Sequence, residues 1–299
     1  MGATRPSRNA PGSHAPTHVH GPTALRIALG TQLRRLREAK GISAEAAGYA
    51  IRASHAKISR MELGRVSFKE RDVADLLTLY DITDEHERKT FLALVRRANV
   101  PDWWHEYSNI LPSWFEMYLG LEQASSVIRS YQPQFMPDLL QTRQVAYEVL
   151  QLSHSQESSS DVERRLALRM ARQQILIRPG APNLWVVVDE AALWRLGEGS
   201  LMRAQLQHLI TMSALPNVRI QVMPISFGAH VAIGGPFTIL RFSEPDLPDI
   251  VYLEQLTSAL YLDKGQDVEH YLKVIDRLCV EARSPAETIK FLADTLKNL

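Results

Sequence analysis

The chain has 299 residues, of which 45% are hydrophobic and 22% charged, with a formal net charge of +1. Its length predicts two domains, and its composition is typical of globular proteins. No window approaches the roughly 18 uninterrupted apolar residues of a membrane span, and the N-terminus lacks the apolar core of a secretion signal. The single cysteine, Cys279, excludes an internal disulfide and fits a reducing compartment. We therefore expect a cytoplasmic protein with no membrane partner.

The charge is distributed unevenly along the chain. Residues 24–69 contain ten Lys and Arg against three Glu, a net charge of +7, so the remaining residues sum to −6. Such asymmetry indicates that the basic part meets a polyanion.

The first 23 residues contain four prolines, no acidic residue and almost nothing apolar, which predicts a disordered tail. His18 and His20 in this tail are solvated polar residues more often than metal ligands. Helical periodicity begins at Leu25, and five short helices are expected before residue 100, as in a compact helical bundle. Their starts are signalled by Ser43, by Ser54 and by the capping-box pattern from Ser67 to Glu70. We assign residues 24–100 to this all-α domain.

Residues 101–299 alternate between helical and β-rich patterns. An extended connection with two prolines is expected over 131–137. Short apolar runs predict strands at 183–189, 217–223, 236–242 and 249–255. Helices are expected at about 113–126, 138–152, 161–178, 200–213, 267–281 and 285–297. The predicted architecture is thus multidomain, with an all-α domain followed by an α+β domain.

The segment 42–65 predicts a helix-turn-helix, because two capped helices are joined by a tight turn. The small Ala47 and Gly48 allow close approach of the helices, and the apolar residues of 51–61 face the first helix. An outer face of the second helix, at 54–64, would then lie in the major groove of double-stranded DNA. That face is formed by four base-contact candidates, namely His55, Ala56, Ser59 and Arg60. Arg60 has the donor geometry to bind guanine bidentately.

This segment resembles the lambda-repressor-like, XRE-type family of helix-turn-helix domains. The matching residue types are Ser43, Ala47, Ile51, Ser54, Ile58, Ser59, Glu62 and Gly64. The resemblance implies a structural pair between Arg37 and Glu62. Two positions depart from the pattern. Gly48 stands where alanine is usual, and Arg52 stands where glycine is frequent, which requires its backbone to stay in the right-handed region.

Four further residues are better placed for phosphates, which position a protein on DNA without reading sequence. They are Ser43, Lys57, Arg65 and Lys69. The alternative interpretation of such cations, and of Arg60, is an ordinary solvated surface charge.

The second domain resembles the uncharacterised domain that follows an XRE module in antitoxin-like regulators of actinomycetes. The match runs through Trp114-Phe115, 131–142, Arg165, Arg169, Gln173, 188–193, Gly235-Pro236-Phe237 and 251–254. The family usually has glycine at position 138, so Asp138 is a departure at a tight turn. The resemblance implies that this domain binds a small partner protein or a small-molecule effector.

An enzyme is the less favoured alternative. Asp189-Glu190 beside His208 or His230 can be imagined as an acid–base or metal site, but the sequence has no His-Glu-x-x-His spacing, no Gly-x-Ser-x-Gly elbow and no phosphate-binding loop. We expect no catalysis, no cofactor and no metal. The tryptophans are expected in the core rather than in a ligand pocket. The arginines at 164, 165, 169 and 172 share one helical face, expected to be exposed or salt-bridged, with partner docking as the alternative.

Two functions remain open. The first is a sequence-specific transcriptional regulator, which the resemblance implies to be a homodimer. The second is an antitoxin-like protein that sequesters a small partner and binds DNA for autoregulation.

Overall fold

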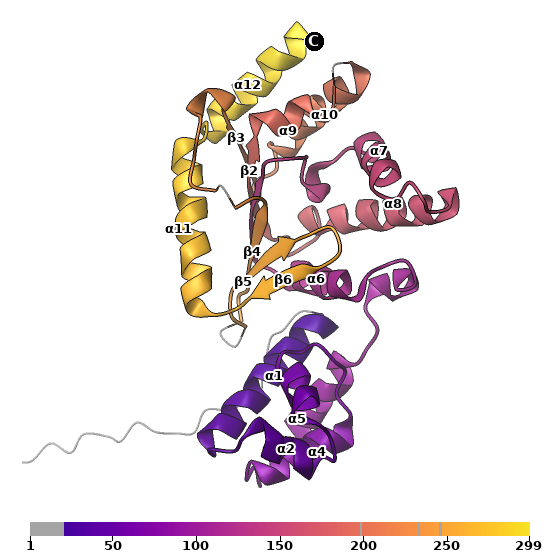
Figure 1. Cartoon of the computed structure of the whole chain (residues 1–299), viewed down its shortest axis with the longest axis vertical. Coiled ribbons are helices and arrows are strands. Elements are labelled where there is room, and N and C mark those ends of the chain that lie inside the picture. Colours follow the sequence, from indigo (N-terminus) through magenta and orange to yellow (C-terminus); the bar gives the residue numbers. More distant parts are fainter. Residues whose placement is uncertain (1–20, 198, 233, 245–246) are drawn as a thin grey trace, which may run out of the picture. The chain divides into compact units, whose positions relative to one another are not determined.

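The computed structural model describes residues 21–197, 199–232, 234–244 and 247–299 (Figure 1). The chain divides into two compact units, Met1–Pro101 and Asp102–Leu299. Most of the predicted tail, residues 1–20 with His18 and His20, lies outside the described residues.

The described residues of the first unit form five α-helices. They are α1 (Pro22–Ala39), α2 (Ala44–Ala50), α3 (His55–Glu62), α4 (Glu70–Leu79) and α5 (Glu85–Ala98). The prediction that Pro22 and Thr23 belong to the tail is wrong, since they form the first turn of α1. Proline suits this position because its missing N–H has no partner in a first helical turn and its φ is already helical.

Local capping explains most of the helix starts in the first unit. The Ser43 and Ser54 hydroxyls accept hydrogen bonds from the first turns of α2 and α3, as predicted. The capping box predicted from Ser67 to Glu70 is wrong, because α4 begins at Glu70 without a side-chain cap. Glu70 instead accepts two hydrogen bonds from Arg96 on α5, at 3.0 and 2.8 Å. The Glu70 carboxylate therefore forms an ion pair with another helix and does not cap its own.

Helix α3 is held against α1 at a distance that only glycine permits. A Cβ atom at Gly30 would lie 2.4 Å from the carbonyl oxygen of Met61 and 2.6 Å from that of Glu62. Gly64, at φ +64°, is equally close to the backbone of Ile27. The orientation of α3 is thus fixed by backbone-to-backbone packing, with buried residues of all five helices around it.

The turn between α2 and α3 differs from the prediction. Arg52 adopts φ 53°, in the left-handed region, whereas a right-handed backbone was expected. The turn geometry that favours glycine in the family is therefore kept, and arginine bears the strain. Gly48 is required here, because a Cβ atom would lie 2.8 Å from the carbonyl oxygen of Ala53.

Replacing Arg52 with glycine is expected to raise the free energy of unfolding of the first unit by about 0.5–1 kcal/mol. A left-handed backbone costs an L-residue about 1–2 kcal/mol, and glycine removes this cost. Glycine also has more conformational freedom in the unfolded chain, which lowers stability by about 0.4–1 kcal/mol and so offsets part of the gain. Urea unfolding followed by far-UV circular dichroism measures the change. Arg71→Gly, at an exposed position inside α4, is the control and should lower stability by about 0.5–1 kcal/mol. A loss of stability in Arg52→Gly would contradict the conclusion that the Arg52 backbone is strained.

The second unit is built on one six-stranded sheet with the order β3-β2-β1-β4-β5-β6. The strands are β1 (Val127–Gln132), β2 (Asn183–Asp189), β3 (Val218–Met223), β4 (Phe237–Arg241), β5 (Ile250–Glu254) and β6 (Ala259–Leu262). Strands β1, β2 and β3 are parallel, whereas β4, β5 and β6 join by antiparallel pairing. This mixed sheet with its helices confirms the predicted α+β class.

Strand β1 was not predicted as a strand. It pairs with β2 on one side and β4 on the other, so it lies in the middle of the sheet. It contains polar residues, so the sequence lacks the apolar run that is typical of a buried strand. The buried Ser130 hydroxyl lies 3.0 Å from that of Thr238, and Arg129 pairs with Asp276 at 2.7 Å. The weak edge strand β6 was also missed.

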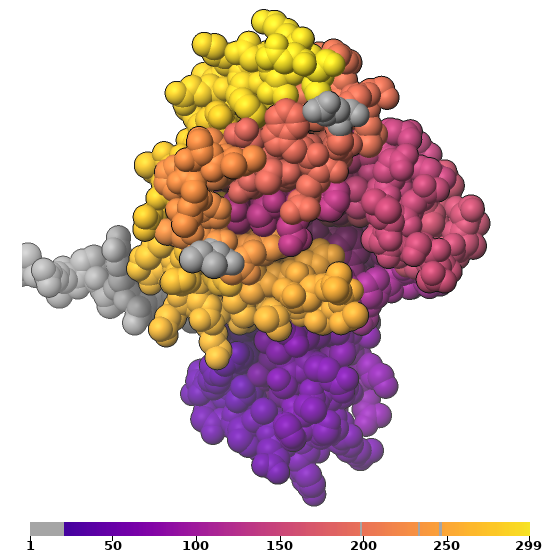
Figure 2. All heavy atoms as spheres, turned by 45° about the horizontal axis from the view of Figure 1, so that its top comes forward, coloured from indigo at the N-terminus to yellow at the C-terminus, as the bar shows by residue number. Residues whose placement is uncertain are grey.

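Helices cover both faces of this sheet (Figure 1). They are α6 (Ser113–Ala124), α7 (Arg143–Ser153), α8 (Ser159–Gln173), α9 (Glu190–Trp194), α10 (Ser200–Met212), α11 (Gly265–Glu281) and α12 (Pro285–Asn298), with short 3-10 turns at Trp103–Tyr107, Asp138–Leu140, Gln174–Leu176 and Ile225–Phe227. Helix α11 packs on one face, where buried residues of β1, β2, β4 and β5 meet it. Helices α7, α8 and α10 lie on the other side. In Figure 2 the magenta-pink α7 and α8 form one flank of this unit, and the yellow α12 lies at its top beside the salmon α10.

Candidate nucleic-acid interface

The outer face of α3 presents the four residues expected to contact bases. His55, Ala56, Ser59 and Arg60 are all exposed, while Ile58 and Met61 on the inner face are buried. The Arg60 Nε donates to the carbonyl oxygen of Ala56 at 3.3 Å, which leaves the terminal guanidinium nitrogens available. Within the described residues Arg60 forms no ion pair, so its charge is not neutralised by the protein.

Three of the four phosphate candidates are also available. Ser43 Oγ accepts from the Ala46 N–H at 3.1 Å, and its hydroxyl hydrogen remains free to donate. Arg65 and Lys69 are exposed in the segment between α3 and α4 and form no ion pair with any described residue. All three therefore satisfy the requirement of a free donor for a phosphate oxygen.

Lys57, the fourth phosphate candidate, has a partner within the protein. Its Nζ forms an ion pair with the buried Asp72 of α4. The side chain points to α4 because position 57 lies between the outer and inner faces of α3. The structure thus gives Lys57 a role in holding α3 against α4, in place of the free cation that was expected.

Two exposed residues near the turn were not among the candidates chosen from the sequence. Tyr49, at the end of α2, is 88% exposed, and Arg52 is exposed with no ion-pair partner among the described residues. A phenol hydroxyl and a guanidinium are both common phosphate donors. The sequence could have indicated them, because Tyr49 is aromatic and Arg52 is basic, and both lie near the end of the first helix of the motif, where burial is not expected.

The pair implied by the family resemblance is present. The Arg37 Nε and Nη2 atoms donate to the Glu62 carboxylate at 2.6 and 2.9 Å, and Nη1 donates to the carbonyl oxygen of Ile42 at 2.8 Å. The hydrogen bonds with Glu62 raise the pKa of Arg37. A bidentate pair between two largely buried side chains fixes the end of α3 to α1.

The loop that carries Arg65 and Lys69 is anchored from the end of α5. The Asn99 side chain accepts from the Phe68 N–H at 3.1 Å and donates to the Phe68 carbonyl oxygen at 2.5 Å. Phe68 itself is buried in the core of the first unit. The position of the two cations therefore depends on the last residues of the unit.

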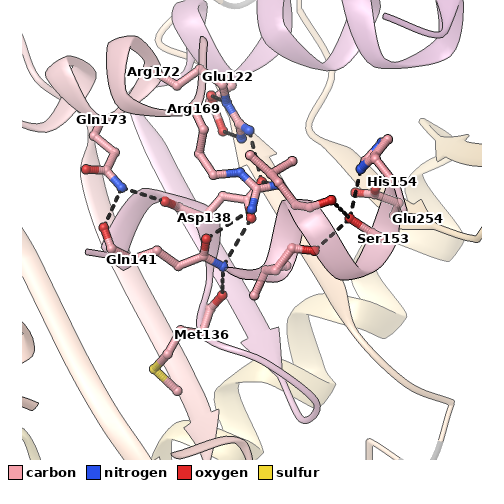
Figure 3. Close-up of polar contacts among 12 residues, drawn as sticks. Glu122, Met136, Asp138, Gln141, Ser153, His154, Arg169, Arg172, Gln173 and Glu254 are labelled. Carbon is pink, nitrogen blue, oxygen red and sulfur yellow. Dashed lines mark hydrogen bonds and ion pairs between the residues drawn. The ribbon is translucent and has the colours of Figure 1, made fainter. Parts of the chain in front are cut away.

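The second unit contains a buried polar network on α6, α8 and the Asp138–Leu140 turn (Figure 3). Arg172 donates to both oxygens of Glu122 at 3.0 and 2.9 Å, and to Asp138 at 3.0 Å. Burial alone would lower the pKa of Arg172, but the Glu122 charge and its hydrogen bonds outweigh that effect and raise it. Gln173 donates to the carbonyl oxygens of Asp138 and Gln141 at 2.8 Å. The network thus links α8 to α6 and to the turn that follows β1.

Most of the arginine-rich face of α8 is salt-bridged, one of the two expectations for it, whereas Arg164 donates to the carbonyl oxygen of Glu106 at 2.8 Å. Arg165 pairs with Glu157 at 2.7 Å, and Arg169 lies 3.5 Å from Asp138. The Asp138 departure is accommodated because the backbone there has no positive φ and the carboxylate gains two guanidinium partners.

The imagined acid–base arrangement is only partly assembled. His230 Nε2 lies 3.8 Å from Asp189 Oδ2, whereas His208 lies on α10 with its Nε2 buried and without a partner among the described residues. Within the described part of the chain, no group of three or more His, Cys, Asp or Glu side chains could hold a metal. None of the described helices combines the length and the apolar composition that a bilayer crossing requires.

Comparisons with known families agree with the two units. A family model described as a helix-turn-helix domain matches residues 28–91, and a model described as a domain of unknown function, DUF5753, matches residues 115–294. No curated protein and no solved structure matched the chain. The first match makes the protein a DNA-binding regulator, with the XRE-like architecture expected from its sequence. The second match spans more than half of the chain, which therefore belongs to the DUF5753 family and carries a helix-turn-helix domain before its DUF5753 domain.

Proposed function

We propose that the protein is a cytoplasmic transcriptional regulator that reads a specific operator by placing α3 in the major groove. The observation that carries this proposal is the outer face of α3, where Arg60 and three small or polar side chains are exposed and form no ion pair with any described residue. Arg65 and Lys69, and at the turn Tyr49 and Arg52, would contact the flanking phosphates. The donors of the face match base edges, and the surrounding cations match the backbone.

In this proposal the protein acts as a homodimer on a two-fold operator, with half-sites about 34 Å apart. The DUF5753 domain modulates DNA binding through a small partner protein or a small-molecule effector, and the chain performs no catalysis. The support for these statements is the family resemblance together with the division of the chain into two compact units.

Arg60→Ala is expected to weaken binding to the native operator by about 1–3 kcal/mol and to reduce the preference for it over scrambled DNA. Fluorescence anisotropy of the full chain, on DNA from upstream of its own gene and on a scrambled duplex, measures both quantities at several salt concentrations. Lys69→Ala is the matched control. It removes a phosphate contact, so it should weaken binding to both duplexes equally and lower the salt slope by about 1.

Equal, steeply salt-dependent binding to both duplexes by the unmodified protein would mean that it is attracted to phosphates without reading the base sequence. Absence of DNA binding would overturn the proposal in favour of an antitoxin-like protein that sequesters a small partner. Co-purification with the product of a neighbouring small gene would then be the relevant measurement.

A further inference from the structure

A cavity of about 370 Å³ opens in the second unit where the parallel strands β1 and β2 end. Tyr131 and Gln134 line it from the end of β1, Asp189 and Arg195 from the end of β2 and beyond α9, and His230 from the loop after β3. These three segments adjoin on the face drawn in Figure 2, in magenta, salmon and orange. The crevice outside the carboxyl ends of parallel strands is the usual ligand position in such sheets, and the volume is in the range of small-molecule sites.

The inner wall of the cavity is a chain of hydrogen bonds. The Ala232 N–H donates to His230 Nδ1 at 3.2 Å, so the ring proton is on Nε2. His230 Nε2 therefore donates to the Tyr131 hydroxyl oxygen at 2.9 Å. Burial and the nearby Asp189 charge raise the pKa of Tyr131. The Ala232 N–H and the His230 ring N–H are thus both used within the protein.

What remains open at the wall is an acceptor. Asp189 Oδ1 takes one hydrogen bond from the Ala191 N–H at 2.9 Å, and its side chain is 19% exposed. No described Lys or Arg pairs with Asp189, and Arg283 pairs with the neighbouring Glu190 at 3.0 Å. A half-buried carboxylate without a cation is stabilised when a ligand supplies one.

The cavity rim carries the opposite charge. Arg195 is exposed, and its guanidinium has neither a hydrogen bond nor an ion pair with any described residue. A ligand that is only anionic would meet the Asp189 charge at the wall. A ligand that is only cationic would leave the Arg195 guanidinium unused.

We propose that this cavity binds a small zwitterion of the amino-acid class, with its ammonium group at Asp189 and its carboxylate at Arg195. This ligand is the small-molecule effector of the DUF5753 domain, so its regulatory meaning rests on the proposed function. Its binding is independent of DNA and is measured without it.

Binding is tested by thermal unfolding and isothermal titration calorimetry of the full chain with each common amino acid at millimolar concentration. Putrescine, an amine without an anion, and succinate, an anion without an amine, are the comparison ligands. At least one amino acid is expected to bind saturably, to raise the unfolding temperature and to bind more tightly than both comparison ligands. Absence of binding by all amino acids, or equal binding of succinate or putrescine, would overturn the proposal.

Two variants locate the site. Asp189→Asn keeps the helix cap of α9 and removes the charge, and Arg195→Ala removes the rim cation without touching the core. Each is expected to weaken amino-acid binding by about tenfold or more. Lys290→Ala, an exposed cation on α12, should leave binding unchanged. Unchanged binding in Asp189→Asn would place the ligand elsewhere. DNA titrations with Asp189→Asn keep this result separate, because its operator binding is expected to match that of the unmodified protein.

Discussion

Replacing Glu122 with alanine is expected to lower the free energy of unfolding of the second unit by about 3–5 kcal/mol. The side chains of Glu122 and Arg172 are only 3% and 4% exposed. Removing the carboxylate leaves a guanidinium packed against Phe115 and Tyr118, with a single remaining anion, Asp138, at its far side. An uncompensated buried charge is among the most destabilising changes a protein can undergo.

Urea unfolding followed by tryptophan fluorescence measures this change selectively, because all five tryptophans lie between residues 103 and 194, in the second unit. The matched control is Glu163→Ala, which breaks an exposed pair with Arg143 and should cost about 0–1 kcal/mol. A double variant, Glu122→Leu with Arg172→Met, should recover most of the loss because it removes both charges. Equal losses in Glu122→Ala and Glu163→Ala would show that the network is not stabilising.

The second large effect concerns Gly30. Gly30→Ala is expected to lower the stability of the first unit by about 1–3 kcal/mol, although alanine is the better helix former by about 1 kcal/mol. The added methyl group would meet the backbone carbonyls of Met61 and Glu62, which cannot rotate away as a side chain could. Helix α1 and α3 would have to separate.

Far-UV circular dichroism reports this loss as an earlier transition that tryptophan fluorescence does not follow. Gly265→Ala, the same change at the first residue of α11 with nothing within 4 Å of the new methyl, is the control and should be neutral or stabilising. Because the methyl group displaces α3, operator affinity should also fall in Gly30→Ala at temperatures where the variant is still folded. Stability equal to that of the unmodified protein would contradict the close approach of α1 and α3.

The candidate interface could be predicted in large part because its determinants are local. Ser43 and Ser54 cap their own helices, and the 3.6-residue period alone separates His55 and Arg60 from the buried Ile58. Lys57 could not be assigned in this way, since its partner Asp72 lies on another helix. The left-handed turn at Arg52 was missed because arginine, unlike the glycine frequent at this position, does not favour a positive φ.

Less of the second unit could be predicted from the sequence, because its interactions join residues that are far apart in the chain. Strand β1 contains Arg129 and Ser130, whose partners Asp276 and Thr238 lie more than 100 residues away, so its pattern is not that of a buried strand. The cavity is assembled from three segments that only the parallel pairing of β1, β2 and β3 brings together. No spacing in the sequence joins Tyr131 to His230.

The anchoring of the loop by Asn99 has a practical consequence for dividing the protein. A fragment cut at the ends of the helix-turn-helix match, residues 28–91, would keep Arg60 but lose the Asn99 clamp on Phe68. It would also lose the hydrogen bond from Arg26 to the Ala98 carbonyl oxygen, at 3.3 Å. The buried residues Leu25, Ile27, Leu94 and Val95 would be missing as well. The smallest autonomous DNA-binding piece therefore extends from residue 21 to at least residue 100, and shorter pieces would test a damaged loop rather than the interface.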